Sequence, residues 1–530
     1  MGIAAGPAGA QTPQVRVCAL DARNDGPLAG ATVRLSADAV ALSATTGSDG
    51  CAWITGSFPV SIEDPVPGVV DLRIGVPYPN PAGSRAWLPV VAGLPLNGTL
   101  DIFDAIGREV ISPLPVSIPI GEQHIELPVA SLRRGTYFAR LSTDAGTAVR
   151  SIVVGGEGQP AGPVGRLATA PASPAVLMDE GVVRIEIERD GFVAAVEERV
   201  VKNNETVRRA LLKITENKVP MIDMKGLAYR GFQGGLYADG TNEMPEAHRL
   251  AGLAAARSIE PLDINGKPDP NGVYILTSIG MSNTSDEFCG VADPNNPCKI
   301  GTFMNRAGLD PEIDHTNFVL IDGADPGKTA EKWVDSGLSD YRRILDEELN
   351  PFGYSEKQVQ IAWIKLANAP PSGTLPDAGA DAFRLQEQFG QVARAMKERY
   401  PNLKMIFFSS RIYAGYATTD RNPEPYAYEQ GFAVKWTVNA QIRQMETGEM
   451  DPVSGDLDLN TVAPWIGWGP YMWADGTNPR SDGLVWTKED FKDDGVHPAK
   501  PGIEKVADML LDFFKSSPLT SCWVLAGSDC

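Results

Sequence analysis

Three side chains in the C-terminal half of this sequence have the types and spacing needed for nucleophilic acyl transfer. Ser282 follows an apolar run, residues 273–279, that predicts a buried strand, so its hydroxyl should lie on the turn at the strand's carboxyl end. Asp494 precedes His497 by three residues, a spacing that lets the carboxylate orient the imidazole ring. A serine, a histidine that accepts its proton and an aspartate that holds the histidine are the minimum parts for this chemistry. The prediction requires two segments about 200 residues apart to meet in space.

The choice of histidine is narrow, because the chain contains four, which are His124, His248, His315 and His497. Only His497 has an aspartate at a suitable offset, and the following Pro498 could fix its loop. Asp493 is the alternative acid, but the Asp-x-x-His spacing favours Asp494. The scarcity of histidine also argues against a histidine-rich zinc site. We therefore expect neither a metal nor a cofactor.

Composition and charge limit the partners of the protein. The 530 residues carry a formal net charge of −20, which disfavours nucleic acid and anionic membranes, since both require clustered Lys and Arg. No run of about 20 apolar residues is present, so no membrane span is expected. The small-residue-rich start, residues 1–11, could be the trimmed end of a signal peptide but is not a complete signal.

The six cysteines indicate the compartment. They fall into three sequence-local pairs, which are Cys18 with Cys51, Cys289 with Cys298, and Cys522 with Cys530. An even number with short intervening loops favours disulfides and an oxidising compartment, although reduced, buried cysteines are the alternative. The sequence contains no Cys-x-x-Cys motif, so metal binding or redox activity of the cysteines is not indicated. We predict an exported protein that is extracellular, at the cell surface or periplasmic.

The first two hundred residues are rich in strands and turns. Pro27-Leu28-Ala29-Gly30-Ala31, followed by Ser48-Asp49-Gly50, resembles the pattern of the carboxypeptidase-regulatory-like β-sandwich family. In that family a strand and a Gly-Tyr or Gly-Phe turn normally follow. Here they appear only much later, at Val182-Val183-Arg184-Ile185-Glu186-Ile187 and Asp190-Gly191-Phe192. The resemblance implies a discontinuous sandwich made of residues 12–67 and 175–214.

A second β unit interrupts this sandwich. Tyr78-Pro79-Asn80-Pro81, Gly98-Thr99-Leu100-Asp101-Ile102-Phe103-Asp104 and Gly135-Thr136-Tyr137-Phe138-Ala139-Arg140-Leu141 resemble the Ig-like module of type IX-secreted and flagellar hook-capping proteins. We interpret residues 68–157 as this inserted module and the Pro/Ala/Gly-rich residues 158–174 as a linker.

Beyond residue 218 strand-like and helix-like segments alternate, which predicts a parallel sheet covered by helices on both faces. We place this three-layer α/β domain at residues 218–518 and a tail at 519–530. In such sheets the site lies beyond the carboxyl ends of the strands, where Ser282 is expected. The predicted strands are 273–279, 317–321, 359–366 and 403–408, and the predicted helices are 329–349, 381–399, 428–445 and 501–514.

The serine and Asp-x-x-His blocks together resemble those of the SGNH/GDSL hydrolases. Gly280-Met281-Ser282-Asn283 departs from Gly-Asp-Ser-Leu and looks more like the Gly-Gln-Ser-Asn block of the carbohydrate acetylesterases. The resemblance implies a Ser282–His497–Asp494 triad that hydrolyses esters through an acyl-enzyme. It also implies an oxyanion hole from the Ser282 N–H, a glycine after the second strand and Asn368. Gly327 is favoured over Gly323 for that glycine.

The expected activity is that of a secreted serine esterase that removes acyl groups. Acetyl esters of carbohydrate are the leading substrate hypothesis. Asn283 and the aromatic residues Trp468, Tyr471 and Trp473 are predicted to contact substrate, although such an aromatic cluster could equally bury a long loop. The alternatives are a lipid or polyester esterase and a non-catalytic surface or carbohydrate-binding protein. The sequence leaves the oligomeric state open.

Overall fold

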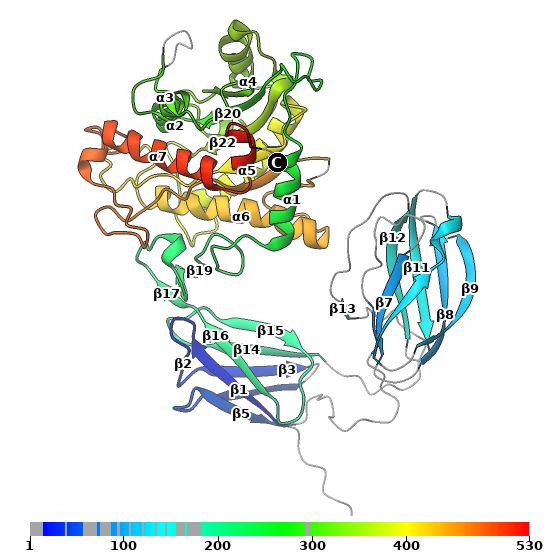
Figure 1. The fold of residues 1–530 in the computed structure, drawn as a ribbon. Helices are drawn as coiled ribbons and strands as arrows, with labels where there is room; N and C mark the ends of the chain where they lie inside the picture. Colours follow the sequence, from blue (N-terminus) through cyan, green and yellow to red (C-terminus); the bar gives the residue numbers. More distant parts are fainter. Residues whose placement is uncertain are drawn as a thin grey trace, which may run out of the picture.

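The protein contains two β-sandwiches and a C-terminal domain built on a parallel sheet, and these bodies are distinct in Figure 1. The computed structural model describes residues 14–37, 40–56, 72–74, 86–92, 96–104, 108–118, 121–132, 135–143, 146–154, 165–166, 182–291, 297–459 and 461–528. No helix within these ranges has the length and apolar character needed to cross a bilayer.

The first sandwich is formed by two stretches of chain that lie far apart in the sequence. β1 pairs in parallel with β16, which brings Val17 beside Val207, and the disulfide Cys18–Cys51 links β1 to β5. Val33 alternates into the core with its strand neighbours pointing outward. The strands are β1 (Gln14–Asp21), β2 (Gly26–Pro27), β3 (Thr32–Ala37), β4 (Val40–Thr45), β5 (Cys51–Thr55), β14 (Val183–Glu188), β15 (Ala195–Arg199) and β16 (Thr206–Leu211).

The second sandwich lies between the two halves of the first in the sequence. Its sheets have the orders β10-β7-β6-β13 and β12-β11-β8-β9. Within the predicted linker, β13 pairs with β6, and the other linker residues lie outside the described ranges. The elements are β6 (Leu72–Ile74), β7 (Ala86–Ala92), β8 (Leu96–Asp104), β9 (Glu109–Ile118), β10 (Gly121–Leu127), η1 (Val129–Ser131), β11 (Gly135–Thr143), β12 (Gly146–Val154) and β13 (Gly165–Arg166).

The C-terminal domain is centred on a five-stranded sheet in which every neighbouring pair runs parallel. The order is β21-β20-β22-β23-β24, so the chain reverses its direction of travel across the sheet between β20 and β22. Ligands bind outside the carboxyl ends of strands at such a switch point. The strands are β20 (Tyr274–Gly280), β21 (Phe318–Ile321), β22 (Val359–Lys365), β23 (Met405–Phe408) and β24 (Trp465–Trp468).

Helices pack on both faces of this sheet, as the alternation of strands and helices predicts. On β22, Ile361 and Trp363 contribute to a core with α1, α2, α3 and α7, whereas Ala362 and Ile364 contribute to a core with α5 and α6. The helices are α1 (Glu246–Arg257), α2 (Ser282–Phe288), α3 (Phe303–Leu309), α4 (Ser339–Arg343), α5 (Asp381–Arg399), α6 (Tyr426–Thr447), α7 (Lys500–Ser516) and α8 (Ser521–Val524).

Short elements complete the domain. A small sheet of β17 (Lys213–Thr215), β18 (Leu227–Tyr229) and β19 (Phe232–Gln233) follows the first sandwich in the sequence. The remaining helical turns are η2 (Met221–Asp223), η3 (Ala330–Lys332), η4 (Ile344–Leu349), η5 (Asn350–Phe352), η6 (Glu356–Gln358) and η7 (Lys488–Asp490).

Three features of the C-terminal domain differ from the sequence expectation. The predicted helix 329–349 is broken, because Gly337 donates its N–H to the Asp335 side chain at 2.8 Å and forms a turn between η3 and α4. β24 lies in a segment for which the sequence analysis predicted no strand. The predicted tail packs into the domain, since Trp523 and Val524 of α8 are buried in its core.

Candidate active site

Ser282 lies on a tight turn between β20 and α2. The backbone at Met281 is extended, with φ −100° and ψ −166°, and α2 begins at Ser282. Gly280 is required at the turn, because a Cβ there would lie 2.1 Å from Oγ1 of Thr284. Thr284 Oγ1 donates to the Lys365 carbonyl of β22 at 2.8 Å, which anchors α2 to the adjacent strand. The local sequence therefore holds the serine hydroxyl at the carboxyl edge of the sheet.

His497 lies on the loop that precedes α7. Lys492 donates its backbone N–H to the His497 carbonyl at 2.8 Å, which closes a tight turn around Asp494. Gly495 adopts φ +67°, and a Cβ there would lie 1.9 Å from the Tyr416 carbonyl, so the turn requires glycine. The turn places the Asp494 carboxylate beside the imidazole ring.

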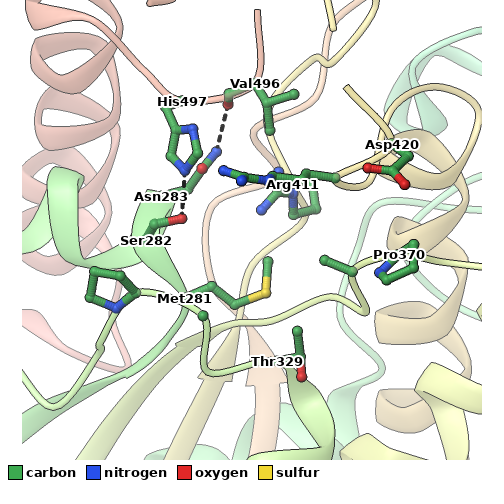
Figure 2. Close-up of a pocket in the computed structure, with 13 residues that line it drawn as sticks. Met281, Ser282, Asn283, Thr329, Pro370, Arg411, Asp420, Val496 and His497 are labelled. Atoms are coloured by element: carbon green, nitrogen blue, oxygen red, sulfur yellow. Dashed lines mark hydrogen bonds between the residues drawn. The ribbon is translucent and has the colours of Figure 1, made fainter. Parts of the chain in front are cut away.

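The structure brings the two predicted segments together (Figure 2). Ser282 Oγ lies 2.7 Å from Nε2 of His497, across 215 residues of sequence. On the other side of the ring, Nδ1 of His497 lies 2.5 Å from Oδ2 of Asp494. Asp493 is exposed and, within the described ranges, makes no hydrogen bond or ion pair with His497, so Asp494 is the acid beside the ring.

The charge on Asp494 fixes the direction of these hydrogen bonds. Burial raises the pKa of Asp494, but hydrogen bonds from the backbone and ring of His497 and from the Val496 backbone outweigh it, so the pKa lies below its usual value. A carboxylate only accepts hydrogen bonds, so Nδ1 of His497 carries a proton. In the neutral ring Nε2 is then the acceptor for the Ser282 hydroxyl, and this arrangement can withdraw the hydroxyl proton.

Two further contacts tie the serine helix to the histidine loop. Asn283 donates its Nδ2–H to the Val496 carbonyl at 2.9 Å, and Lys492 pairs with Asp286 of α2 at 2.7 Å. Asn283 is 1% exposed. Asn283 lines the cavity, and its Nδ2 group also holds the histidine loop, so its contact with substrate stays a prediction.

Ser282 and His497 open onto a cavity of about 520 Å³. This volume lies in the range of about 300–1,000 Å³ typical of small-molecule sites. Segments that follow each of the five strands contribute to the wall, and the close-up shows their side chains around the serine. The lining residues are Met281, Ser282, Asn283, Pro326, Gly327, Thr329, Ala369, Pro370, Arg411, Asp420, Arg421, Val496 and His497.

The candidate oxyanion donors other than the Ser282 N–H have different surroundings. Gly327 lines the cavity, and within the described chain its N–H has no hydrogen-bond partner. Gly323 is buried against Ser278 and does not line the cavity. Asn368 donates its amide to Asp381 at 3.0 Å and to Gln388 at 2.9 Å, so both of its N–H groups are engaged away from the cavity.

The aromatic residues predicted to contact substrate belong to the core instead. Trp468, Tyr471 and Trp473 are at most 6% exposed, and none of them lines the cavity. Nε1 of Trp468 donates to the Leu236 carbonyl, and the Tyr471 hydroxyl accepts from the Met221 N–H. The cluster therefore buries the loop beyond β24, which is the alternative that the sequence left open.

The described contacts of two other histidines are structural. His248 stacks on Trp465 with ring centroids 4.8 Å apart, and burial lowers its pKa to about 4. His315 bonds to the Asp310 carbonyl at 2.9 Å on the surface. Neither of these residues lines the cavity.

The sequence reasoning missed the charged residues of the cavity. Arg411, Asp420 and Arg421 come from the long connection between β23 and α6. Arg411 lies three residues beyond the end of a buried strand, and a charged residue in that position was the available signal. No spacing motif accompanies it.

The predicted disulfides Cys18–Cys51 and Cys289–Cys298 are both present. Cys289 directly follows α2, so its disulfide restrains the chain that leaves the serine helix. Cys522 is also disulfide-bonded, and its predicted partner Cys530 lies outside the described residues.

Residues 77–155 match the family described as the secretion system C-terminal sorting domain. This range covers most of the second sandwich, where the sequence resembled the module of type IX-secreted proteins. The sorting domain and the two disulfides identify a secreted or cell-surface protein, which confirms the predicted export.

The solved structures that this chain resembles include three proteins of limited similarity. A GDSL-like lipase from Parabacteroides merdae is 12% identical, with a TM-score of 0.27, and the match covers 45% of this chain and 94% of that one. A family two carbohydrate esterase from Cellvibrio japonicus is 9% identical, with a TM-score of 0.27 and coverages of 85% and 96%. A carbohydrate acetylesterase from Xanthomonas citri is 12% identical, with a TM-score of 0.23 and coverages of 83% and 74%.

No curated protein sequence matches the chain significantly. At such TM-scores the structural similarities carry no argument, so the functional conclusion depends on the geometry of the site itself.

Proposed function

We propose that this secreted or cell-surface protein is a serine-dependent esterase in which Ser282 is the nucleophile. The observation that carries the proposal is the continuous hydrogen-bonded chain from Ser282 through His497 to Asp494 at a cavity. Its 2.7 Å contact between hydroxyl and imidazole is within the reach that proton transfer requires.

In the proposed first step, Ser282 Oγ attacks the ester carbonyl while its proton moves to Nε2 of His497. The new Oγ–C bond forms, and the carbonyl π electrons move to oxygen. The tetrahedral intermediate then collapses, the bond to the alcohol oxygen breaks, and His497 returns its proton to the departing alcohol. Asp494 keeps the ring in the productive tautomer and stabilises the imidazolium.

In the second step, water replaces the alcohol. The water oxygen attacks the carbonyl carbon of the acyl-serine while His497 accepts a proton from that water. His497 then passes this proton to Ser282 Oγ as the bond between Oγ and the acyl carbon breaks. The products are a carboxylic acid and the free serine. The reaction therefore consumes one ester and one water per cycle.

We assign the oxyanion hole to the backbone N–H groups of Ser282 and Gly327. Each such donor contributes on the order of 3 kcal/mol to the stability of the transition state. Gly327 favours this role because it lines the cavity and its N–H has no partner among the described residues. Asn368 is the weaker candidate, since both of its amide hydrogens are donated to Asp381 and Gln388.

Acetyl esters of carbohydrate are the substrates we propose to test first. The Gly280-Met281-Ser282-Asn283 block and the secretion of the protein support this choice. The aromatic cluster beyond β24 no longer supports it, because these side chains are buried in the core. Lipid or polyester esters would use the same mechanism and belong in the same substrate screen.

Turnover of 4-nitrophenyl acetate tests the proposal. We expect hydrolysis by the wild-type protein and no turnover above the uncatalysed rate by Ser282→Ala. If pure protein hydrolyses neither this reporter, acetylated xylan nor the lipid and polyester esters of the screen, and Ser282→Ala behaves identically, the result contradicts the proposal and favours a non-catalytic binding protein.

A further inference from the structure

A buried arginine faces the cavity next to the proposed nucleophile. Arg411 is 1% exposed and lines the same cavity as Ser282 and His497. Its guanidinium points toward the part of the cavity where Ser282, Asn283 and His497 lie (Figure 2). The proposed hydrolysis of a neutral ester assigns no task to this charge.

The topology explains how Arg411 reaches the site. β20 and β23 are separated by β22, so the chain beyond β23 lies about 10 Å from the chain beyond β20, at two strand spacings. Arg411 follows β23, and its long side chain extends across the carboxyl ends of the strands toward the serine. Gly327 comes from the opposite side of Ser282, after β21.

The guanidinium has no partner within the described protein. It donates no side-chain hydrogen bond and forms no ion pair there, and its Nε is buried without an acceptor. Burial lowers the pKa of Arg411, whereas the charges of Glu287 and Glu424 oppose that effect. An arginine keeps its charge in proteins, so the cavity wall carries a buried, unpaired cation.

The two carboxylates whose charges act on the pKa of Arg411 are already engaged. Glu287 is paired with Lys365 in a fully buried ion pair. Glu424 accepts hydrogen bonds from Nε1 of Trp473 at 2.7 Å and from the backbone at 3.1 and 3.3 Å. Neither one neutralises Arg411 by direct contact.

The backbone of Arg411 is fixed. Its N–H donates to Oε1 of Gln430 at 2.9 Å, and the Gln430 amide donates to the Leu366 and Ser409 carbonyls at 3.1 and 3.3 Å. A side chain that starts from a rigid point loses less conformational entropy when it binds a ligand. A planar guanidinium in this position is suited to a carboxylate, which it can bind through two parallel hydrogen bonds.

We propose that Arg411 binds a carboxylate carried by the substrate, so that the esters cleaved at Ser282 belong to acidic molecules. This inference rests on the proposed esterase function. The carboxylate could belong to the alcohol part, as in an acylated uronic acid, or to the acyl part, as in a half-ester of a dicarboxylic acid. The recognition chemistry is the same in both cases.

Two matched substrate pairs separate these sources. The alcohol arm compares a methyl O-acetyl-glucuronoside with the corresponding glucoside, and the acyl arm compares ethyl hydrogen succinate with ethyl butyrate. The measured quantity is the ratio of kcat/KM for the anionic ester to that for the neutral ester, followed by proton release. We expect the wild-type ratio to exceed one in the arm that matches the substrate.

Substitution of Arg411 tests its assignment. Arg411→Met should lower this ratio by about 10- to 100-fold, the range for loss of a hydrogen-bonded charge, and Arg411→Lys should restore part of it. Arg443→Met is the matched control, because Arg443 is an exposed arginine on α6 that does not line the cavity, and its ratio should not change.

The result that would overturn the inference is equally specific. The inference is wrong if the wild-type ratio of kcat/KM for the anionic ester to that for the neutral ester is one or below in both arms, whether or not the Arg411 variants fold. An equal loss of activity toward both members of each pair would also overturn it, because it assigns Arg411 to the oxyanion that every ester forms.

A binding measurement separates this inference from the proposed reaction. In the Ser282→Ala background, calorimetry measures the affinity for each anionic and neutral ester without turnover. The carboxylate site is supported if Ser282→Ala binds the anionic ester more tightly and the double variant Ser282→Ala with Arg411→Met loses this preference. This result would hold even if the wild-type protein hydrolyses nothing. Equal affinity for both members overturns it even if the esterase activity is confirmed.

Discussion

Replacement of Asp494 by Asn tests whether the carboxylate sets the tautomer of His497. In the wild type, Oδ1 of Asp494 accepts the N–H groups of Val496 and His497, each at 3.0 Å, and Oδ2 faces Nδ1 of the ring at 2.5 Å. An asparagine that keeps both backbone hydrogen bonds must place its NH₂ group toward Nδ1. That contact requires an unprotonated Nδ1, so the proton moves to Nε2 and the base loses the lone pair that faces Ser282.

The size of the effect follows from this change of tautomer. A wrong tautomer lowers kcat in serine–histidine–aspartate sites by about 10⁴-fold, or about 5.5 kcal/mol. The Asp494 side chain is 29% exposed, so water shares part of its role and we expect a loss of about 10³- to 10⁴-fold. KM should change little, because Asp494 does not line the cavity.

The assay is the steady-state hydrolysis of 4-nitrophenyl acetate, with circular dichroism to show that the variant is folded. Asp493→Asn is the matched control, since Asp493 is the exposed neighbour with the same side chain. Its kcat should stay within about twofold of the wild-type value, as for surface substitutions away from the site. Loss of activity in Asp493→Asn, or a loss below tenfold in Asp494→Asn, would refute the reasoning.

Three further predictions concern stability. Burial raises the pKa of Asp322 to about 8, so between pH 5 and 8 the folded protein holds a proton that the unfolded chain has lost. The free energy of unfolding should therefore fall by roughly 3–4 kcal/mol from pH 5 to pH 8. Denaturant titrations of Asp322→Asn at both pH values should show no such fall. Lys365→Met leaves Glu287 buried without its partner and should lower the free energy of unfolding by about 3–5 kcal/mol. The double variant Lys365→Met with Glu287→Leu should recover most of this lost stability. Equal losses in the single and double variants would contradict this account. Gly495→Ala places a Cβ against the Tyr416 carbonyl in a left-handed turn, so we expect a lower Tm together with a lower kcat, and an unchanged Tm would show that the turn tolerates a side chain.

The regular parts of the C-terminal domain are predictable because their signals are local. The apolar spacing in residues 381–399 defines α5, and the buried run beginning at Val359 defines β22. The proximity of Ser282 and His497 was inferred from chemistry, since a serine and a spaced Asp/His pair have a joint use that neither has alone.

The remaining parts depend on partners that are distant in the sequence. Trp468 and Tyr471 are buried because Leu236 and Met221, which precede the parallel sheet in the chain, cover them. Asn368 turns from the cavity because Asp381 offers an acceptor on α5. No pattern within the aromatic segment or around the asparagine encodes these contacts, so their local sequences are compatible with either role.

Arg411 illustrates the same limit. A single arginine after a strand has no periodic or spaced signal, and its meaning depends on a β20–β22–β23 order that periodicity does not predict. Its importance emerges only when the acids near it, Glu287 and Glu424, are seen to be engaged elsewhere.

The most direct test of the central claim is the covalent trapping of the nucleophile by a fluorophosphonate, with mass mapping of the modified peptide. The account predicts one phosphonyl group on Ser282, formed with loss of esterase activity, and labelling that is much slower in His497→Ala. A protein that hydrolyses esters yet is labelled at another residue, or that remains active after complete modification of Ser282, would contradict it.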